Sequence, residues 1–309
     1  MNKDSMDGSQ LNGILVLNKP RGLSSAQCTG RIKRLGQKKI GHAGTLDPMA
    51  TGVLIVLLGQ ATKLSGYLLE GGEKRYEGIL RLGISTDTWD VEGKIVRECT
   101  LDSDPAELER LARDDIENWT SLTEQEVPPY SAAKHDGQPL YKLARTGKDI
   151  PVKMKKINVT QAEVQSVNLP DVRFRVSCSS GSYIRSLAHS LGMRLGWGAT
   201  LTELTRVYSH PYSLNLAHSL EDVLARPEEL PSKTLPLSSA LPNWPVYTAD
   251  DKSEENLRNG KAIPHEHGEF QASQRALFLN KEGYSLALVE AGIQQGRQVW
   301  AVLRGLSTP

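Results

Sequence analysis

The chain has 309 residues, of which 39% are hydrophobic and 24% are charged, and its formal net charge is +1. These values indicate a soluble globular protein with a sizeable core, in two domains or in one large domain with an appendage. The longest apolar run, Val53 to Leu58, is too short to span a membrane, and the polar N-terminus lacks the apolar region of a signal peptide. Three scattered cysteines indicate neither a disulfide framework nor a zinc site. We therefore expect a cytoplasmic protein.

Charge is distributed unevenly along the chain. Residues 8–69 carry eight lysines and arginines but a single acid, Asp47. Residues 101–127 carry nine acids against two arginines, and residues 130–160 carry seven basic residues against two aspartates. The two basic segments are suited to lining a groove for a polyanion, whereas solvated surfaces are the simpler explanation. Charge alone favours the solvated surfaces.

The first half of the chain alternates short strands and helices. A strand over 11–19 ends at a proline, and the Ser24-Ser25 pair caps a helix to about residue 35. Strands are predicted at 52–59 and 73–83 with a short helix between them, followed by a hairpin over 85–99. Residues 102–114 begin with a cap, a proline and acids in the first turn, a pattern that predicts a helix.

The second half opens on a polar, basic, proline-bounded segment at 125–156, which is typical of a long functional loop and holds one helix near 139–145. Strands are predicted at 157–167 and 172–177, a helix at 182–196 and a returning strand at 198–209. Prolines mark a looser connection over about 230–245, and strands follow at 275–280, 284–290 and 297–304. The pattern predicts an α+β fold with a mixed, mainly antiparallel sheet and a small C-terminal β-rich domain.

Asp47 is the first candidate for chemistry, because a carboxylate among positive charges should stay ionised and is then able to act as nucleophile or base. An ordinary turn aspartate is the alternative, and the residue alone favours it. Gly41, Gly44 and Gly52 shift that balance, since glycines let another backbone approach closely. His42 is a candidate base or stacking side chain. No second His or Cys stands at ligand spacing, so no metal is expected.

Further candidates are aromatic or cationic. Strand alternation leads us to expect Tyr76 to face the site, with Lys74 and Glu77 facing water. Tyr183 and Arg185 begin a helix after a Ser/Gly turn whose amides are able to receive a phosphate, and Arg185 is the candidate partner for a carboxylate. Core packing and surface ion pairs are the alternatives. Nucleotide-binding, serine-hydrolase and zinc-deaminase motifs are absent, whereas aromatic rings, His and Arg suit an unstacked RNA base.

One segment closely resembles the central motif of the TruB family of tRNA pseudouridine synthases: "GHAGTLDPMATGVLIVLLGQATKL". Four others are similar to further motifs of the family in the same order, over roughly residues 11–207: "GILVLNKPRGLSS", "KRYEGILRLGISTDTWDVEGKIV", "VPPYSAAKHDGQPLYKLAR" and "CSSGSYIRSLAHSLGMRLGWGATLTELTR". The resemblance implies a sheet core of the pseudouridine synthase type in a catalytic domain at 1–240, an inserted RNA-gripping loop at 125–156, and a PUA-like domain at 245–309.

The resemblance also implies an activity. Uridine 55 in the T-loop of tRNA would be flipped out and isomerised to pseudouridine by an aspartate-dependent cleavage and re-joining of the glycosidic bond, without cofactor or metal. Asp47 would be the catalytic nucleophile, Arg185 its ion-pair partner and Tyr76 the ring stacked on the uracil. The resemblance leaves three steps open for Asp47: attack on the sugar, attack on the base, or abstraction of a sugar proton. The other substrate contacts would be His42, Tyr183, Leu204, Lys19, Lys63, Lys134, Arg145 and Arg206. The partner would be tRNA and the expected state a monomer. The alternative is a T-loop-binding tRNA-folding protein in which catalysis is secondary.

Overall fold

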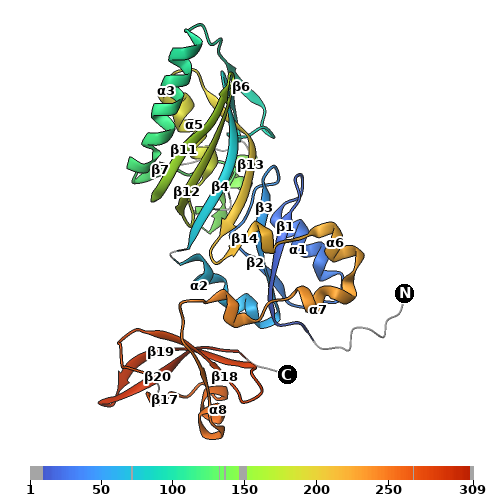
Figure 1. Ribbon diagram of the computed structural model, residues 1–309, viewed down its shortest axis with the longest axis vertical. Coiled ribbons are helices and arrows are strands. Elements are labelled where there is room, and N and C mark those ends of the chain that lie inside the picture. Colours follow the sequence, from blue (N-terminus) through green and yellow to red (C-terminus); the bar gives the residue numbers. More distant parts are fainter. Residues whose placement is uncertain are drawn as a thin grey trace.

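The computed structural model describes residues 10–70, 72–131, 133–135, 137–145, 152–266 and 268–306. The polar N-terminal residues 1–9 and part of the predicted loop at 125–156 lie outside the described residues. Figure 1 shows an elongated molecule, in which a long sheet with helices beside it occupies the upper and middle parts and a smaller C-terminal sheet lies below. No helix in the described part of the chain is long and apolar enough to cross a membrane.

Within the described residues, the central sheet has nine strands, seven of which follow the order β11-β12-β4-β13-β3-β1-β15. Their bounds are β1 (Gly13–Lys19), β3 (Thr51–Leu58), β4 (Glu73–Leu82), β11 (Val159–Asn168), β12 (Asp171–Ser179), β13 (Ala199–Ser209) and β15 (His218–Ser219), with β2 (Ile40–Ala43) beside β3 and β14 (Tyr212–Ser213) beside β13. The β13–β3 and β1–β15 pairs are parallel and the other neighbours are antiparallel. The predicted mixed, mainly antiparallel sheet is confirmed.

The two halves of the sheet meet at a short ladder. In the described chain β3 pairs with β13 over two positions, one of which sets Gly52 opposite Arg206. Gly52 has φ +98°, and a Cβ atom there would lie 2.3 Å from the Arg206 carbonyl oxygen. The Arg206 side chain is fully buried and donates to the carbonyl oxygens of Val53 and Gly44, at 2.7 Å each, and of Thr45 at 3.5 Å. One guanidinium thus joins both strands and the loop that precedes β3.

Helices cover one face of this sheet: α1 (Ser25–Lys33), α3 (Pro105–Glu117), α5 (Ile184–Arg194) and α6 (Leu220–Ala225). In Figure 1, α3 and α5 lie beside β11 and β12, and α1 and α6 lie beside β1. Helix α1 begins at a capping box, in which the Ser24 hydroxyl accepts from the Gln27 amide at 3.2 Å and the Gln27 side chain accepts from the Ser24 amide at 2.8 Å. The core beneath the helices includes Leu17, Ile32, Leu54, Trp119, Phe174 and Leu187.

The remaining elements of this part are short. They are η2 (Gly59–Leu64), α2 (Ser65–Leu69), β5 (Ile84–Thr86), β6 (Ile95–Glu98), η3 (Asn118–Ser121), β7 (Glu124–Glu126), β8 (Lys134–His135), β9 (Gln138–Pro139), α4 (Leu140–Arg145), β10 (Met154–Lys156), η4 (Leu214–Leu216), η5 (Pro227–Glu229), α7 (Leu230–Lys233) and η6 (Leu237–Ala240). The predicted hairpin is β5–β6, and the predicted helix near 139–145 is α4. Strand β2 has no counterpart in the sequence prediction, because its four residues show no apolar alternation.

The C-terminal sheet has the order β16-β18-β19-β20-β17 and carries one helix; its elements are β16 (Val246–Thr248), α8 (Asp251–Arg258), β17 (Ile263–Pro264), β18 (Arg275–Leu279), β19 (Ser285–Gln294) and β20 (Arg297–Gly305). Its residues Leu277, Leu288 and Leu306 share one apolar cluster with Ile14 and Ile55 of β1 and β3. Strand β3 is therefore covered on both faces, which explains its unbroken apolar sequence. The predicted division into residues 1–240 and 245–309 remains a prediction.

Gly52→Ala is expected to destabilise the protein, because the added methyl group collides with the Arg206 backbone and the left-handed φ disfavours alanine. We expect a loss of about 2–4 kcal/mol in the free energy of unfolding, measured by urea denaturation. Gly66→Ala is the matched control: it lies in α2 with no atom within 4 Å of the new Cβ, and a gain of up to about 1 kcal/mol is expected there. Equal effects of the two substitutions would contradict the close approach at Gly52.

Candidate active site

A cavity of about 600 Å³ opens where β4 and β13 meet the loop between β2 and β3 and the N-terminus of α5. Segments far apart in the sequence supply its walls, and five of the predicted site residues are among them. The lining includes Asp47, Tyr76, Tyr183, Arg185 and Leu204, together with Gly44, Lys74, Lys155 and the residues at 180–182. This convergence makes the cavity the candidate active site.

Asp47 is held in place by the backbone on either side of it. The Ser25 hydroxyl donates to the Leu46 carbonyl at 3.0 Å and accepts from the Leu46 amide at 2.9 Å. The Gly22 amide donates to the Pro48 carbonyl at 2.8 Å. The Asp47 side chain itself is 33% exposed, so its carboxylate is fixed in position and still reachable from the cavity.

Arg185 forms the predicted pair with Asp47. Its Nη2 atom donates to Asp47 Oδ1 at 2.9 Å, although the arginine side chain is only 3% exposed. The same guanidinium donates to the carbonyl oxygens of Thr88 at 2.8 Å and Tyr130 at 3.1 Å, and its Nη1 lies 3.5 Å from Asp90 Oδ2. A charge-assisted contact with three further oxygens around it fixes the guanidinium plane, and with it the orientation of the Asp47 carboxylate.

Asp90 is a buried carboxylate that the sequence reasoning missed. Burial raises its pKa, while the Arg185 guanidinium acts in the opposite direction. Its Oδ1 accepts from the Thr88 hydroxyl at 2.7 Å and from the Glu92 amide at 3.0 Å. Arg185 therefore lies between two carboxylates, one facing the cavity and one in the interior. The available signal was an acid in the predicted hairpin after Tyr76, but the hairpin alone gave no reason to place it beside Arg185.

A ring stack supports the loop that carries Asp90. Trp89 is buried in a left-handed conformation, with φ +64°, and its ring lies parallel to that of His189 at 4.2 Å. His189 follows Arg185 by one turn of α5, so both side chains leave the same face of the helix. Two side chains one turn apart on α5 therefore contact this loop. Arg185 does so through charge and hydrogen bonds, and His189 through ring stacking.

The wall opposite the α5 N-terminus comes from β4 and β13. Tyr76 is 5% exposed, and burial raises its pKa to about 12, so its phenol is neutral at physiological pH. Lys74 corrects our expectation: it does not face water but lines the same cavity, because strand side chains two apart share a face. Lys74 is 8% exposed, and burial, with Arg206 and Lys155 nearby, lowers its pKa to about 8.

Two predicted substrate contacts are placed differently from expectation. Lys19 is fully buried and donates to the carbonyl oxygens of Pro20 at 2.8 Å, Leu23 at 2.5 Å and Pro48 at 3.2 Å. Arg206 is equally buried and bonded to backbone carbonyls. Neither side chain lines the cavity. Each forms hydrogen bonds with backbone carbonyls of a loop beside Asp47. Direct contact of these two side chains with the substrate remains a prediction, although their burial and their bonds to backbone carbonyls give it no support.

Two further predicted contacts, His42 and Lys63, do not line the cavity. His42 is half-buried on β2 with its Nε2 atom 3.3 Å from the Thr45 hydroxyl, and burial lowers its pKa. Lys63 on η2 donates to the Gly305 carbonyl at 2.5 Å, at the junction with the C-terminal sheet. Lys134 and Arg145 belong to β8 and α4, and their side chains lie outside the described part of the structure.

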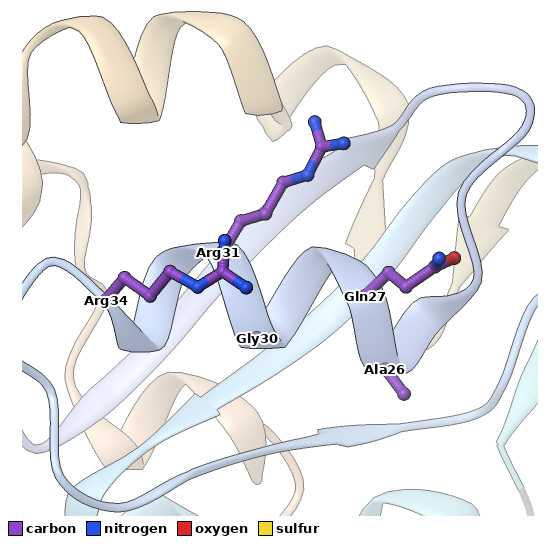
Figure 2. A pocket seen from close by; sticks show the side chains of 5 residues that line it. All are labelled: Ala26, Gln27, Gly30, Arg31 and Arg34. Carbon is purple, nitrogen blue, oxygen red and sulfur yellow. The ribbon is translucent and has the colours of Figure 1, made fainter.

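A second depression, on α1, offers no chemistry of its own. Figure 2 shows it along one helix, with the side chains of Gln27, Arg31 and Arg34 extending away from the ribbon. It holds no acid, thiol or imidazole, and its lining comes from this single helix. Across the described residues, no three His, Cys, Asp or Glu side chains are grouped as a metal ion would require.

Arg185→Met is expected to lower the free energy of unfolding by about 3–5 kcal/mol, since Asp90 then stays buried without a cation. Urea denaturation measures the loss, and adding Asp90→Asn should recover part of it. Arg81→Met is the control, because it breaks a partly exposed pair with Asp171 at 2.8 Å, for which we expect less than about 1 kcal/mol. Similar losses for the two single variants would contradict a buried charge shared through Arg185.

Comparison with known proteins identifies the family. The model of the TruB family pseudouridylate synthase N-terminal domain matches residues 32–184. The proteins named tRNA pseudouridine synthase B of Nitratidesulfovibrio vulgaris (strain Miyazaki F) and Oleidesulfovibrio alaskensis are 55% and 57% identical to the chain, over 96% of it and 97% of each relative.

Solved structures agree on the fold. A Cbf5-Nop10-Gar1 complex contains a chain with a TM-score of 0.66 and 22% identity, over 96% of this chain and 85% of that one. An H/ACA RNP bound to a substrate RNA containing 2′-deoxyuridine gives a TM-score of 0.67 at the same identity and coverage. With relatives this similar along almost its whole length, the chain belongs to the TruB family of pseudouridine synthases.

Proposed function

We propose that this chain isomerises uridine 55 in the T-loop of tRNA to pseudouridine, with Asp47 as the catalytic nucleophile. The observation that carries the proposal is the Asp47–Arg185 pair at 2.9 Å, set in a cavity with a tyrosine and a leucine in its wall. A charged carboxylate, a flat ring and an apolar side chain are what a uridine needs for attack and for stacking. The full-length relatives named tRNA pseudouridine synthase B support tRNA as the substrate.

The chemistry requires no external reactant. The bond between uracil N1 and ribose C1′ breaks, the uracil turns while still bound, and a bond forms between C5 and C1′. The proton of C5 is lost and N1 gains one, so the product is an isomer of the substrate. Arg185 donates a hydrogen bond to Asp47 Oδ1. The other carboxylate oxygen, Oδ2, has no hydrogen-bond partner among the described residues. That oxygen is available for covalent attack.

The cavity walls offset the cost of extracting the base. Extruding a stacked nucleotide costs a few kcal/mol, and stacking on an aromatic ring returns about 1–3 kcal/mol per base. Tyr76 supplies that ring, and its neutral phenol, with a pKa near 12, adds no charge to repel the carboxylate or the RNA. Leu204, 6% exposed, and Tyr183 complete the contacts with the uracil.

The basic segments then serve the RNA backbone. The segment at 125–156 contributes Lys134 and Arg145, Lys63 lies beside the C-terminal sheet, and His42 stacks in the loop from which the uridine has been removed. Phosphate contacts of this kind position the RNA without reading its sequence. In this proposal the enzyme acts as a monomer, since the described residues that line the cavity need no second chain, and it acts in the cytoplasm, as expected from the sequence.

Asp47→Asn is expected to abolish pseudouridine formation in transcript tRNA by at least about a thousandfold, because the amide keeps the shape but lacks the charge of the nucleophile. Affinity for the tRNA should change little. Pseudouridine mapping after incubation measures the effect, with Asp171→Asn, far from the cavity, as the control. A tRNA-folding protein with secondary catalysis would retain its main effect in this variant. If Asp47→Asn formed pseudouridine at the wild-type rate, Asp47 would not be the nucleophile.

Affinity for tRNA is expected to fall with salt. For about three phosphate contacts, the dissociation constant should rise about 10- to 100-fold between 50 and 200 mM salt, because bound counterions are released. Filter binding at four salt concentrations gives the slope. Binding through uncharged interactions would give a dissociation constant that does not change with salt.

A further inference from the structure

One side of the active cavity carries positive charge that the roles above do not use. Lys74 lines the cavity, is 8% exposed, and makes no hydrogen bond or ion pair with any of the described residues. Arg206 and Lys155 repel the Lys74 ammonium group and thereby lower its pKa. Burial raises the pKa of the nearby Cys178 thiol to about 11, so this thiol is neutral at physiological pH. A buried ammonium without an anion destabilises the free protein. Its position is understandable if an anion arrives with the substrate.

Lys155 faces the cavity from β10. Its Nζ atom lies 5.8 Å from the centroid of the Tyr183 ring, and a Cβ atom on Gly181 would lie 2.2 Å from that Nζ. Gly181 has φ +90°, so the ammonium group lies against bare backbone that only glycine provides. Lys155 therefore brings a second positive charge to the turn at 180–182, in front of α5.

The start of α5 adds a third source of positive potential. Tyr183, the N-cap residue, places no side-chain acceptor on the first-turn amides, and residues 180–185 all line the cavity. The Tyr183 amide already donates to Gln125 Oε1 at 2.6 Å, so the contribution of α5 is the positive end of its helix dipole, which favours an anion there. On the other side, Gly44 makes room for Lys74: it has φ +74°, and a Cβ atom there would approach Lys74 Nζ to 3.2 Å.

We propose that Lys74, Lys155 and the turn at 180–182 bind one phosphodiester group of the RNA strand, next to the uridine that reaches Asp47. The inference rests on the proposed function. Lys74 and Tyr76 stand two residues apart on one face of β4, about 7 Å along the strand. A base stacked on Tyr76 therefore brings a phosphate of its own nucleotide within reach of Lys74. The two non-bridging oxygens of that phosphate match the two ammonium groups.

The first test removes each charge. In Lys74→Met and in Lys155→Met, the dissociation constant of a T-arm hairpin should rise about tenfold, the usual effect of losing one charged hydrogen bond. Lys94→Met is the control, because it removes the same charge from an exposed residue that neither lines the cavity nor belongs to the segment at 125–156; it should change affinity by less than about twofold. The melting temperature of Lys74→Met should equal or exceed that of the wild type, since a buried cation is removed. Equal effects of Lys155→Met and Lys94→Met would overturn the subsite.

The second test identifies the phosphate. Each test hairpin carries one neutral methylphosphonate linkage, either on the 5′ or on the 3′ side of the target uridine. The nucleotide before that linkage is a 2′-deoxynucleotide, which prevents strand cleavage. Each hairpin is compared with the same strand bearing a phosphodiester at that position. For one of the two linkages, the loss of affinity should not add to that of Lys74→Met. Additive losses for both linkages would reject the contact. A wild-type protein that makes no pseudouridine in the unmodified hairpin would instead reject the proposed function, and the binding cycle would still report on the subsite.

Discussion

The buried guanidinium of Arg206 is the interaction on which the active cavity depends. Strands β3 and β13 share a two-position ladder in the described structure, too short to hold two halves of a sheet by itself. Arg206 supplies the missing bonds from β13 to the carbonyl of Val53 on β3 and to that of Gly44 in the preceding loop. Backbone carbonyls, rather than a carboxylate, satisfy the charge. The strand that carries Leu204 and the loop that carries Asp47 are therefore located by the same side chain.

The guanidinium of Arg185, unlike that of Arg206, pairs with carboxylates. It lies between the reachable carboxylate of Asp47 and the buried carboxylate of Asp90, so three charges sum to a single negative one. A neutral partner would orient Asp47 less firmly, and an arginine without Asp90 would pair with Asp47 alone and neutralise it. The Trp89–His189 stack, one helical turn further along α5, keeps the interior carboxylate in position.

Prediction from the sequence succeeded where a local pattern decides the outcome. The capping box at Ser24, the apolar strand at 53–58 and the Ser/Gly turn before α5 are local. The family resemblance singled out Asp47, Arg185 and Tyr76, which line one cavity, while their catalytic roles remain predictions. It failed where partners come from distant segments. Lys19 and Arg206 were expected to contact the substrate, because nothing in the sequence shows that backbone carbonyls of other loops surround them. Strand alternation places Lys74 on the same face as Tyr76, so the expectation that Lys74 faces water was wrong. The position of Asp90 next to Arg185 depends on the packing of α5 against the hairpin, which no local pattern shows.

The C-terminal sheet bears on the active cavity without being near it. Its leucines cover the face of β1 and β3 that the helices leave open, so the strand that follows Asp47 is clamped between two cores. Cutting the chain before β16 would bare the apolar side chains of a central strand. The truncated protein would then fail through loss of solubility and a displaced Asp47, and its inactivity would say nothing about which part of the molecule grips RNA.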